Sequence, residues 1–147
     1  MLKHSLLFAV LALFFVPFIS QAQTVTIEAQ DNLRFSVEEI VAQPGEEITI
    51  KLVNNTKFPA VAMSHNLVLL KNEADVTAFA QAAMMAKDNG YIPADKTNLI
   101  IAHTAMLAGG ESDTITFTAP KEPGTYVYIC TFPGHFAAGM VGKLVVK

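Results

Sequence analysis

The C-terminal stretch TYVYICTFPGHFAAGMVGKLVVK, residues 125–147, has the pattern of a strand, a loop and a final strand. Residues 125–130 are mostly aromatic or β-branched and residues 143–147 are mostly aliphatic, which is typical of strands. Between them, CTFPGHFAAGM (residues 130–140) contains the Pro and Gly residues that favour a loop. The stretch therefore predicts the last two strands of a β fold, with chemically reactive side chains on their connection.

The rest of the chain repeats this strand pattern. Apolar and polar residues alternate over 24–29, 47–53 and 114–118, and shorter strand candidates cover 33–37, 66–71 and 99–104. Residues 72–90 instead have helical spacing, with Asn72 as the N-cap and Gly90 as the C-terminal stop, and residues 91–98 are expected to form a loop. Seven or eight short strands separated by turn signals predict an all-β sandwich with one short helical insert.

Residues 1–22 have the features of a signal peptide. Lys3 gives a positive start, residues 6–19 form an apolar run, and Ser20 and Ala22 are small residues at the cleavage-determining positions. The run of 14 residues is too short to span a bilayer comfortably, although an N-terminal membrane anchor is the alternative interpretation. We therefore expect export, to the periplasm, of a single domain covering residues 23–147, with no membrane span in its mature form.

Composition narrows the possible functions further. The chain has 147 residues, is 52% hydrophobic and carries a net charge of −3, so it can bury a core. With a single Arg and a mildly acidic balance it is not expected to bind nucleic acid, because binding phosphates needs clustered cations. The single Cys excludes an intramolecular disulfide and a CxxC pair. In an oxidising compartment a lone thiol has to be buried or metal-bound, which draws attention to Cys130.

The 130–140 loop carries three kinds of metal ligand. Cys130, His135 and Met140 supply a thiol, an imidazole and a thioether, and His65 begins a strand after a Pro-containing loop. One Cys, two His and a weak axial Met form the ligand set of a blue-copper site. Each residue alone could equally be structural. Cys130 could also be a nucleophile beside His135, or a zinc ligand, but the sequence offers no orienting group and no further zinc ligand of the usual kind.

The motif CTFPGHFAAGM, together with MSHNLVL (63–69) and NLIIAHT (98–104), resembles the cupredoxins, and within them azurin and auracyanin. The ending AGMVGKLVVK (138–147) is more similar to plastocyanin, in which the axial Met follows the last His by five positions, as it does here. The resemblance implies a Greek-key sandwich holding one type 1 copper ion. It implies four ligands, which are His65, Cys130, His135 and Met140.

The resemblance also suggests roles for residues beside the ligands. Asn66 matches the family residue that ties the two ligand loops together near the thiolate, and Phe132, two positions after Cys130, is expected to support the site from beside the ligands. Ser64 stands where azurin has a Gly whose carbonyl approaches copper from the second axial side. Leu67 stands where azurin often has a buried Trp, and the disulfide typical of azurin is absent because there is no second Cys.

These features predict an electron carrier that cycles between Cu(I) and Cu(II) and transforms no substrate, so we expect no enzymatic activity. The electron is expected to leave through a solvent-facing edge of His135, where redox partner proteins would dock on a small apolar patch. The candidate patch residues are Met63, Phe132, Pro133, Phe136 and Ala138.

The same ligand set is compatible with two other copper functions. A copper enzyme would need a second centre, for which only His103 remains in the mature chain. A copper chaperone or buffer of the cell envelope is the alternative function. The feature it would use is the pair Met84 and Met85, which we expect to pack on the helix.

Overall fold

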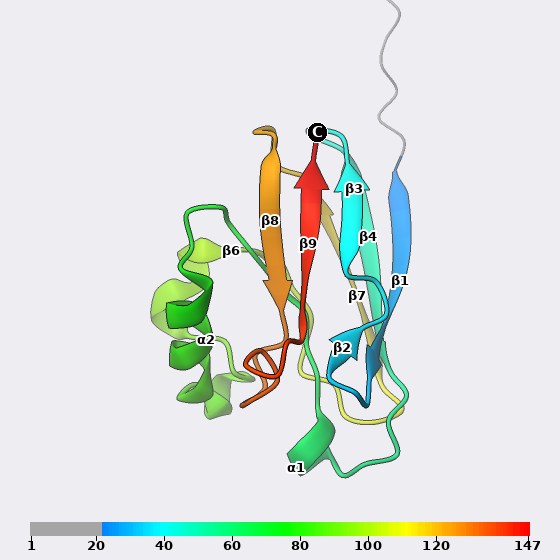
Figure 1. Ribbon diagram of the computed structural model, residues 1–147, viewed down its shortest axis with the longest axis vertical. Coiled ribbons are helices and arrows are strands. Elements are labelled where there is room, and N and C mark those ends of the chain that lie inside the picture. The colour runs from blue at the N-terminus through cyan, green and yellow to red at the C-terminus, as the bar shows by residue number, and fades with distance from the viewer. Residues whose placement is uncertain (1–21) are drawn as a thin grey trace, which may run out of the picture.

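The computed structural model describes residues 22–147, which form two β-sheets packed face to face (Figure 1). The first sheet has the order β2-β1-β4-β7 and the second the order β3-β9-β8-β5-β6. The all-β sandwich is therefore confirmed, although the described residues contain nine strands rather than seven or eight. The strands are β1 (Gln23–Gln30), β2 (Arg34–Phe35), β3 (Glu39–Ala42), β4 (Glu47–Asn54), β5 (Val68–Leu70), β6 (Ile100–His103), β7 (Ser112–Thr118), β8 (Gly124–Ile129) and β9 (Val141–Val146).

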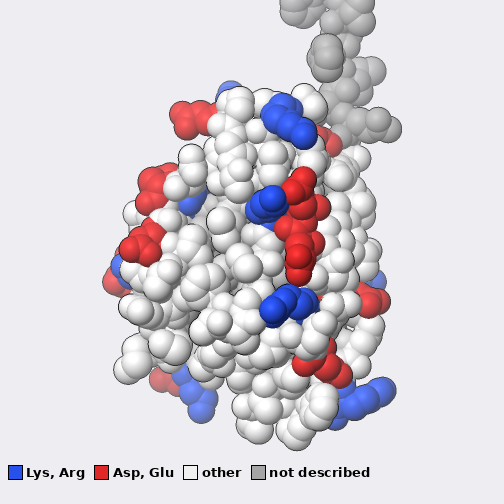
Figure 2. Space-filling view, in the orientation of Figure 1, with Lys and Arg blue, Asp and Glu red and all other residues white. Residues whose placement is uncertain are grey.

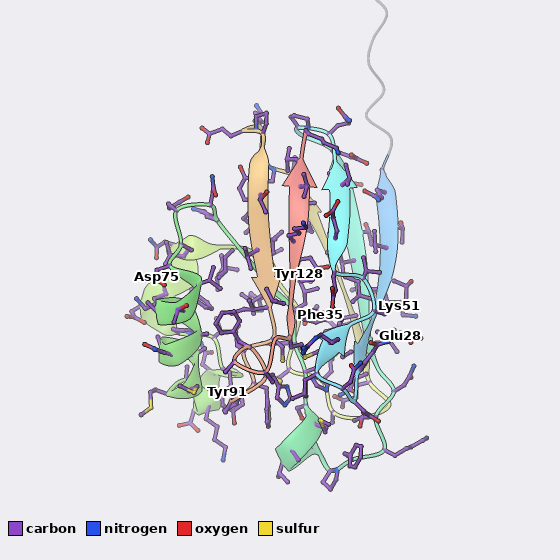
Figure 3. All side chains as sticks on the ribbon, in the orientation of Figure 1. Glu28, Phe35, Lys51, Asp75, Tyr91 and Tyr128 are labelled. Atoms are coloured by element: carbon purple, nitrogen blue, oxygen red, sulfur yellow. The ribbon has the colours of Figure 1, made fainter. Side chains whose placement is uncertain are left out.

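The alternating stretches of the sequence build the core as predicted. In β4, Ile48, Ile50 and Leu52 are all at most 1% exposed, while the intervening residues face outward or lie half-buried. This strand is central because β1 pairs with it in parallel and β7 pairs with it antiparallel. The second sheet contributes Tyr128 on β8, whose ring meets the ring of Phe35 edge-on at 5.3 Å (Figure 3). Both sheets therefore turn their apolar faces toward one shared core.

Strand β3 is the one strand among the described residues that the sequence pattern did not predict. It is only four residues long, with Ile40 and Ala42 buried, and it runs parallel to β9 at the edge of its sheet. Four residues are too few to establish a period, and the partner strand lies about a hundred positions later in the chain.

The helical region differs from the expected insert over residues 72–90. Helix α2 covers Val76–Met84 and is capped by Asp75, whose carboxylate accepts a hydrogen bond from the Ala78 amide at 2.9 Å. Asn72 is therefore not the N-cap. Asp75 has that role, because its side chain accepts a hydrogen bond from a free amide in the first turn of the helix. Gly90, at φ +60°, does end a helical segment as predicted, but that segment is the short 3₁₀ helix η1 (Lys87–Asn89).

Two further helical segments were not predicted. A second 3₁₀ helix, η2 (Ala94–Leu99), occupies most of the expected loop at 91–98. A single-turn helix, α1 (Ala60–Met63), follows Pro59 and lies at the same end of the sandwich as the β8–β9 loop (Figure 1). Pro59 has the extended conformation that suits the residue before a helix, and its carbonyl accepts the first two bonds of the turn.

Within residues 22–147, no helix has both the length and the hydrophobicity needed to cross a membrane. The signal peptide predicted over residues 1–22 lies outside the described residues except for Ala22. It therefore stays a prediction.

Candidate metal centre

Three of the four predicted ligands meet at one end of the sandwich. His65 lies between α1 and β5, Cys130 directly follows β8, and His135 lies on the loop that leads to β9. The sulfur of Cys130 is 3.8 Å from Nδ1 of His65 and 3.5 Å from Nδ1 of His135, and one donor atom from each residue lies within 4.8 Å of the others. The two imidazole rings are 4.7 Å apart between centroids.

His65 is fixed by its own backbone. Its amide donates to the Leu107 carbonyl at 3.0 Å, and the Leu107 amide donates back to the His65 carbonyl at 2.8 Å. Two backbone bonds to one facing residue leave the segment little freedom to rotate. The His65 ring is therefore presented from a rigid bridge at the end of the sheets.

Asn54 supports that bridge and was not identified as part of the site from the sequence. It is fully buried at the end of β4, and its Nδ2 donates to the Met63 carbonyl at 2.9 Å and to the Leu107 carbonyl at 3.0 Å. Its Oδ1 accepts a hydrogen bond from the Thr56 amide. In the sequence, Asn54 is part of an Asn-Asn-Thr loop, and only the fold brings Met63 and Leu107 to it.

Cys130 is buried in the apolar core. Burial raises the pKa of its thiol to about 12, while hydrogen bonds from the backbone amides of Asn66 and Phe132 oppose that rise. Without a cation, the sulfur would therefore remain a protonated thiol at neutral pH. A bound metal ion would instead favour the thiolate, and the two amides would stabilise it.

Asn66 and Thr131 connect the two ligand segments. The Thr131 amide donates to Asn66 Oδ1 at 2.8 Å, and Asn66 Nδ2 donates to Thr131 Oγ1 at 2.8 Å. Asn66 is fully buried and Thr131 is 2% exposed. The residue after His65 is thereby tied to the residue after Cys130, in the place that the family resemblance gives to Asn66.

His135 is more enclosed than its exposed loop suggests, and the expected solvent-facing edge can only be a small part of its ring. Its loop is exposed at Pro133 and Gly134, but the His135 side chain itself is only 4% exposed. The Phe132 ring packs on it at 4.7 Å between centroids, and the backbone carbonyl of Ala62 in α1 lies close enough to raise its pKa in part. The turn of helix after β4, which the sequence pattern did not predict, therefore lies beside this histidine.

Burial lowers the pKa of both histidines. For His65 the value falls to about 4, with the neighbouring His135 acting in the same direction and the Asp31 carboxylate acting against it. For His135 the pKa is lowered by burial and raised in part by the Ala62 carbonyl. Both rings are therefore neutral at pH 7, which is the form that binds metal ions.

Met140 and Ser64 lie beside these three residues. Met140 is fully buried, its amide donates to the His135 carbonyl at 2.9 Å, and its carbonyl accepts from the Cys130 amide at 3.2 Å. Ser64 is 7% exposed, and its hydroxyl donates to the Ala60 carbonyl at 2.8 Å, so the hydroxyl is engaged by α1.

The donor set fits a copper ion. Two ligands of one ion, each about 2.0 to 2.3 Å from it, lie about 3.5 to 4 Å apart, as the sulfur and the Nδ1 atoms do here. The ring atom of His65 that faces the Cys130 sulfur is Nδ1, whereas its Nε2 is buried and has no hydrogen-bond partner among residues 22–147. A thiolate and two imidazoles in apolar surroundings suit copper, because soft sulfur favours Cu(I) and imidazole also binds Cu(II).

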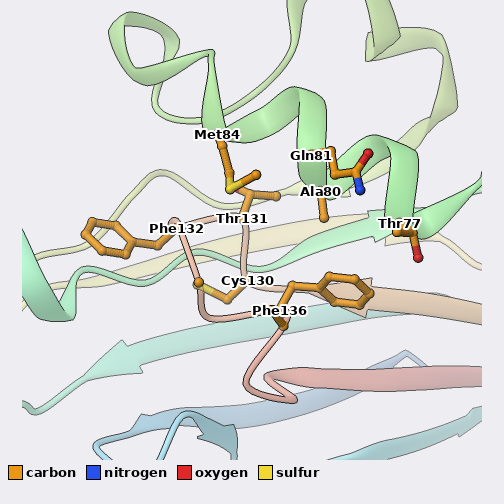
Figure 4. A pocket seen from close by; sticks show the side chains of 10 residues that line it. Thr77, Ala80, Gln81, Met84, Cys130, Thr131, Phe132 and Phe136 are labelled. Carbon is orange, nitrogen blue, oxygen red and sulfur yellow. The ribbon is translucent and has the colours of Figure 1, made fainter.

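The expected docking patch is only partly a surface. Pro133 and Ala138 are exposed, whereas Met63, Phe132 and Phe136 are half-buried. Phe136 packs against the apolar cluster that includes Phe79 of α2, and it lines a pocket of about 240 Å³ between α2 and the loop (Figure 4). Phe136 therefore contributes more to packing under α2 than to the outer surface.

Other apolar side chains are exposed at the same end of the molecule. Phe58 and Val61 are 54% and 88% exposed, next to and within α1. In the space-filling view, the tip of the molecule over α1 is white, with Lys or Arg side chains to either side (Figure 2). The uncharged surface at this end thus extends over α1, beside His135.

The fold and the donor set together define a β-sandwich protein with a Cys-His-His metal centre. Residues 21–147 match the family described as copper binding proteins, plastocyanin/azurin family. The chain belongs to this family, and it carries a single type 1 copper site.

Individual relatives agree with this assignment. The chain is 38% identical to azurin of Achromobacter denitrificans over 143 residues, which cover 93% of each chain. It is 40% identical to auracyanin-B of Chloroflexus aurantiacus over 127 residues, covering 85% of this chain but only about half (52%) of that protein. Among solved structures, auracyanin A, a "blue" copper protein of Chloroflexus aurantiacus, superposes with a TM-score of 0.76 at 38% identity, covering 86% of this chain and all of that one.

Proposed function

We propose that the protein is an exported, periplasmic electron carrier, and that His65, Cys130 and His135 hold its copper ion with Met140 as a weak axial ligand. The observation that carries this proposal is the buried Cys130 sulfur within 3.8 Å of both imidazoles, in a chain of a blue-copper family. The ion supplies the one-electron change between Cu(I) and Cu(II). The residues around it contribute fixed positions and an apolar shell, and they transform no substrate.

The rigid support of the ligands suits electron transfer. His65 is held by Leu107, which Asn54 supports in turn. Asn66 holds the residue after Cys130, and a backbone bond from Cys130 to Met140 joins the two ends of the loop. Ligands that keep their places in both oxidation states minimise rearrangement when the electron moves. The same rigidity opposes the ready exchange of the metal ion.

The route to the surface that we propose runs from the His135 ring past Ala62 of α1, whose backbone carbonyl lies near that ring. We therefore place the docking surface for redox partner proteins over α1 and the adjoining loop. Its exposed members are Phe58, Val61, Pro133 and Ala138. A small apolar surface favours brief encounters, as an electron carrier requires.

Electron self-exchange tests this proposal without a known partner. NMR line broadening in mixtures of oxidised and reduced protein measures the exchange rate between two copies. Val61→Asp places charges at the contact and is expected to slow exchange at least about tenfold while leaving the optical spectrum unchanged. The matched control is Thr118→Asp on the exposed end of β7, at the opposite end of the sandwich. Equal rates in the two variants would contradict the docking surface.

Copper buffering or delivery is the second candidate function, and one observation favours it. Met84 and Met85, expected to pack on the helix, are 47% and 88% exposed at the end of α2. Replacing both with Leu is expected to leave the rate of copper release to a chelator unchanged if the protein is a carrier. Slower release from the double variant would favour delivery.

A further inference from the structure

The only arginine in the sequence touches the ligand loop. Arg34 begins β2, in the sheet opposite the one that carries Cys130 and Met140. Its Nη1 donates to the Leu33 carbonyl at 2.8 Å and to the Ala138 carbonyl at 2.7 Å. One guanidinium nitrogen thus joins the start of β2 to a residue 104 positions later in the chain.

Gly139 receives the flat face of this guanidinium. A Cβ on Gly139 would lie 3.0 Å from each of Cζ, Nη1 and Nη2 of Arg34, and such equal distances mean that the group lies over the backbone there. The backbone of Gly139 also has φ +99°, a conformation that other residues rarely adopt. Glycine therefore allows both the turn and the close approach of the arginine.

The contact is made next to the axial ligand. Ala138 and Gly139 immediately precede Met140, on the stretch that begins at His135. That stretch is held internally by bonds from the Ala138 amide to the Gly134 carbonyl and from the Met140 amide to the His135 carbonyl. Arg34 adds the tie that comes from the facing sheet.

No carboxylate in the described part of the chain lies within 4.0 Å of the Arg34 guanidinium. Among residues 22–147, the one ion pair within 4.0 Å joins Lys143 and Glu39. Arg34 itself is half-buried, where screening by water is weaker than on an open surface. A positive charge beside a metal centre disfavours the more positive oxidation state.

We propose that Arg34 is a positioning residue of the copper centre, holding residues 138–140 in place from the facing sheet and favouring Cu(I) by its charge. The effect on copper rests on the proposed ligand role of His135 and Met140. The tie itself is a property of the protein with or without copper.

Two variants separate the tie from the charge. Arg34→Gln removes both, whereas Arg34→Lys keeps the charge but loses the planar group that bridges two carbonyls. Lys121→Gln, in the exposed turn before β8 at the opposite end of the sandwich, removes an equal charge and is the control. The measurements are amide hydrogen exchange of the copper-free protein and the reduction potential of the copper-loaded protein.

We expect exchange at Gly139 and Met140 to accelerate about tenfold or more in both Arg34 variants, the factor expected for one lost charged hydrogen bond. Exchange in β4 should not change. The reduction potential should fall in Arg34→Gln and stay closer to the original value in Arg34→Lys. Lys121→Gln should alter neither measurement.

Unchanged exchange at residues 139–140 in both variants, or equal acceleration throughout the sheets, would overturn the proposal. A potential that does not fall in Arg34→Gln would overturn the role of the charge. If the proposed copper ligands were wrong, the copper-loaded protein would lack a blue spectrum. Amide hydrogen exchange of the copper-free variants would still decide whether Arg34 holds the loop.

Discussion

Asn66 and Thr131 hold the two ligand segments together through buried hydrogen bonds in both directions. Each residue directly follows a proposed ligand, His65 or Cys130, so the pair fixes the distance between them. This tie joins β5 to the start of the loop after β8 without using either ligand's own side chain. A defect here should therefore disturb stability and the metal centre together.

Replacing Asn66 with Ala is expected to destabilise the copper-free protein by about 2 to 4 kcal/mol, because the Thr131 amide and hydroxyl lose their partner while buried. Urea unfolding measures this change. Thr49→Val, at a half-buried position on the outward side of β4, removes only the hydroxyl contact with Thr116. It is the matched control and should cost about 1 kcal/mol or less. Equal effects at both positions would contradict the structural role of Asn66.

Met140→Leu should retain copper and raise the reduction potential. The thioether is a weak ligand, so its loss removes little affinity, while an apolar group in its place disfavours the more charged Cu(II). Because Leu is close to Met in volume, the fully buried site should lose no more than about 1.5 kcal/mol of stability. Voltammetry and thermal unfolding provide the two measurements. A lower potential, or loss of copper, would argue against Met140 as the axial ligand.

The two histidines should differ in rescue by added imidazole, although both are buried. His135 is flanked by the exposed Pro133 and Gly134, so His135→Gly should open a path from solvent to the centre. His65 is flanked by Ser64, Asn66 and Leu67, all buried, so His65→Gly should leave a closed cavity. Optical titration of both copper-loaded variants with imidazole compares them. Equal rescue would mean that the two rings are equally accessible.

The copper-free protein should stay folded at neutral pH and lose stability as the pH falls from 6.5 toward 4. The unfolded chain protonates His65 near pH 6.5, whereas the folded chain, with a His65 pKa of about 4, does not. The unfolded state therefore binds more protons in this window, and stability declines with falling pH. Urea unfolding at pH 7 and pH 4.5 in the presence of a chelator measures the change.

His65→Gln is the control for that experiment because it removes the titrating ring. The variant should lose much of the pH dependence, with the remainder due to His135 and the carboxylates. The folded copper-free state is expected because the core around Ile48, Ile50 and Leu52 is built without the ligands. A random-coil far-ultraviolet spectrum at pH 7 would contradict this view of the scaffold.

Much of the scaffold and the residues of the centre could be predicted from local sequence. The strict alternation in β4 fixed which side chains face the core, and the spacing of Cys130, His135 and Met140 placed three donors on one loop. The alternation and the ligand spacing each lie within a short stretch of the sequence. Strand β3 could not be predicted in this way, because its four residues are a strand only through their pairing with β9.

The supporting contacts could not be predicted because they join distant segments. Asn54 reaches Leu107, and Arg34 reaches Ala138, across 53 and 104 positions. The position of α1 beside His135 could not be predicted either, because this single turn has no room for helical periodicity. In each case the packing of the two sheets determines which residue the side chain contacts. The local sequence pattern does not indicate that partner.

The measurement that tests the copper centre most directly is the optical and EPR spectrum of the copper-loaded protein, with and without reductant, beside that of Cys130→Ser. We predict an intense blue band in the oxidised protein that disappears on reduction and returns on reoxidation, because the thiolate supplies both the short bond and the charge-transfer colour. We predict no such band in Cys130→Ser, whose hydroxyl provides neither. An unmodified protein without the intense band, or a Cys130→Ser variant that keeps it, would contradict a type 1 copper centre built on Cys130.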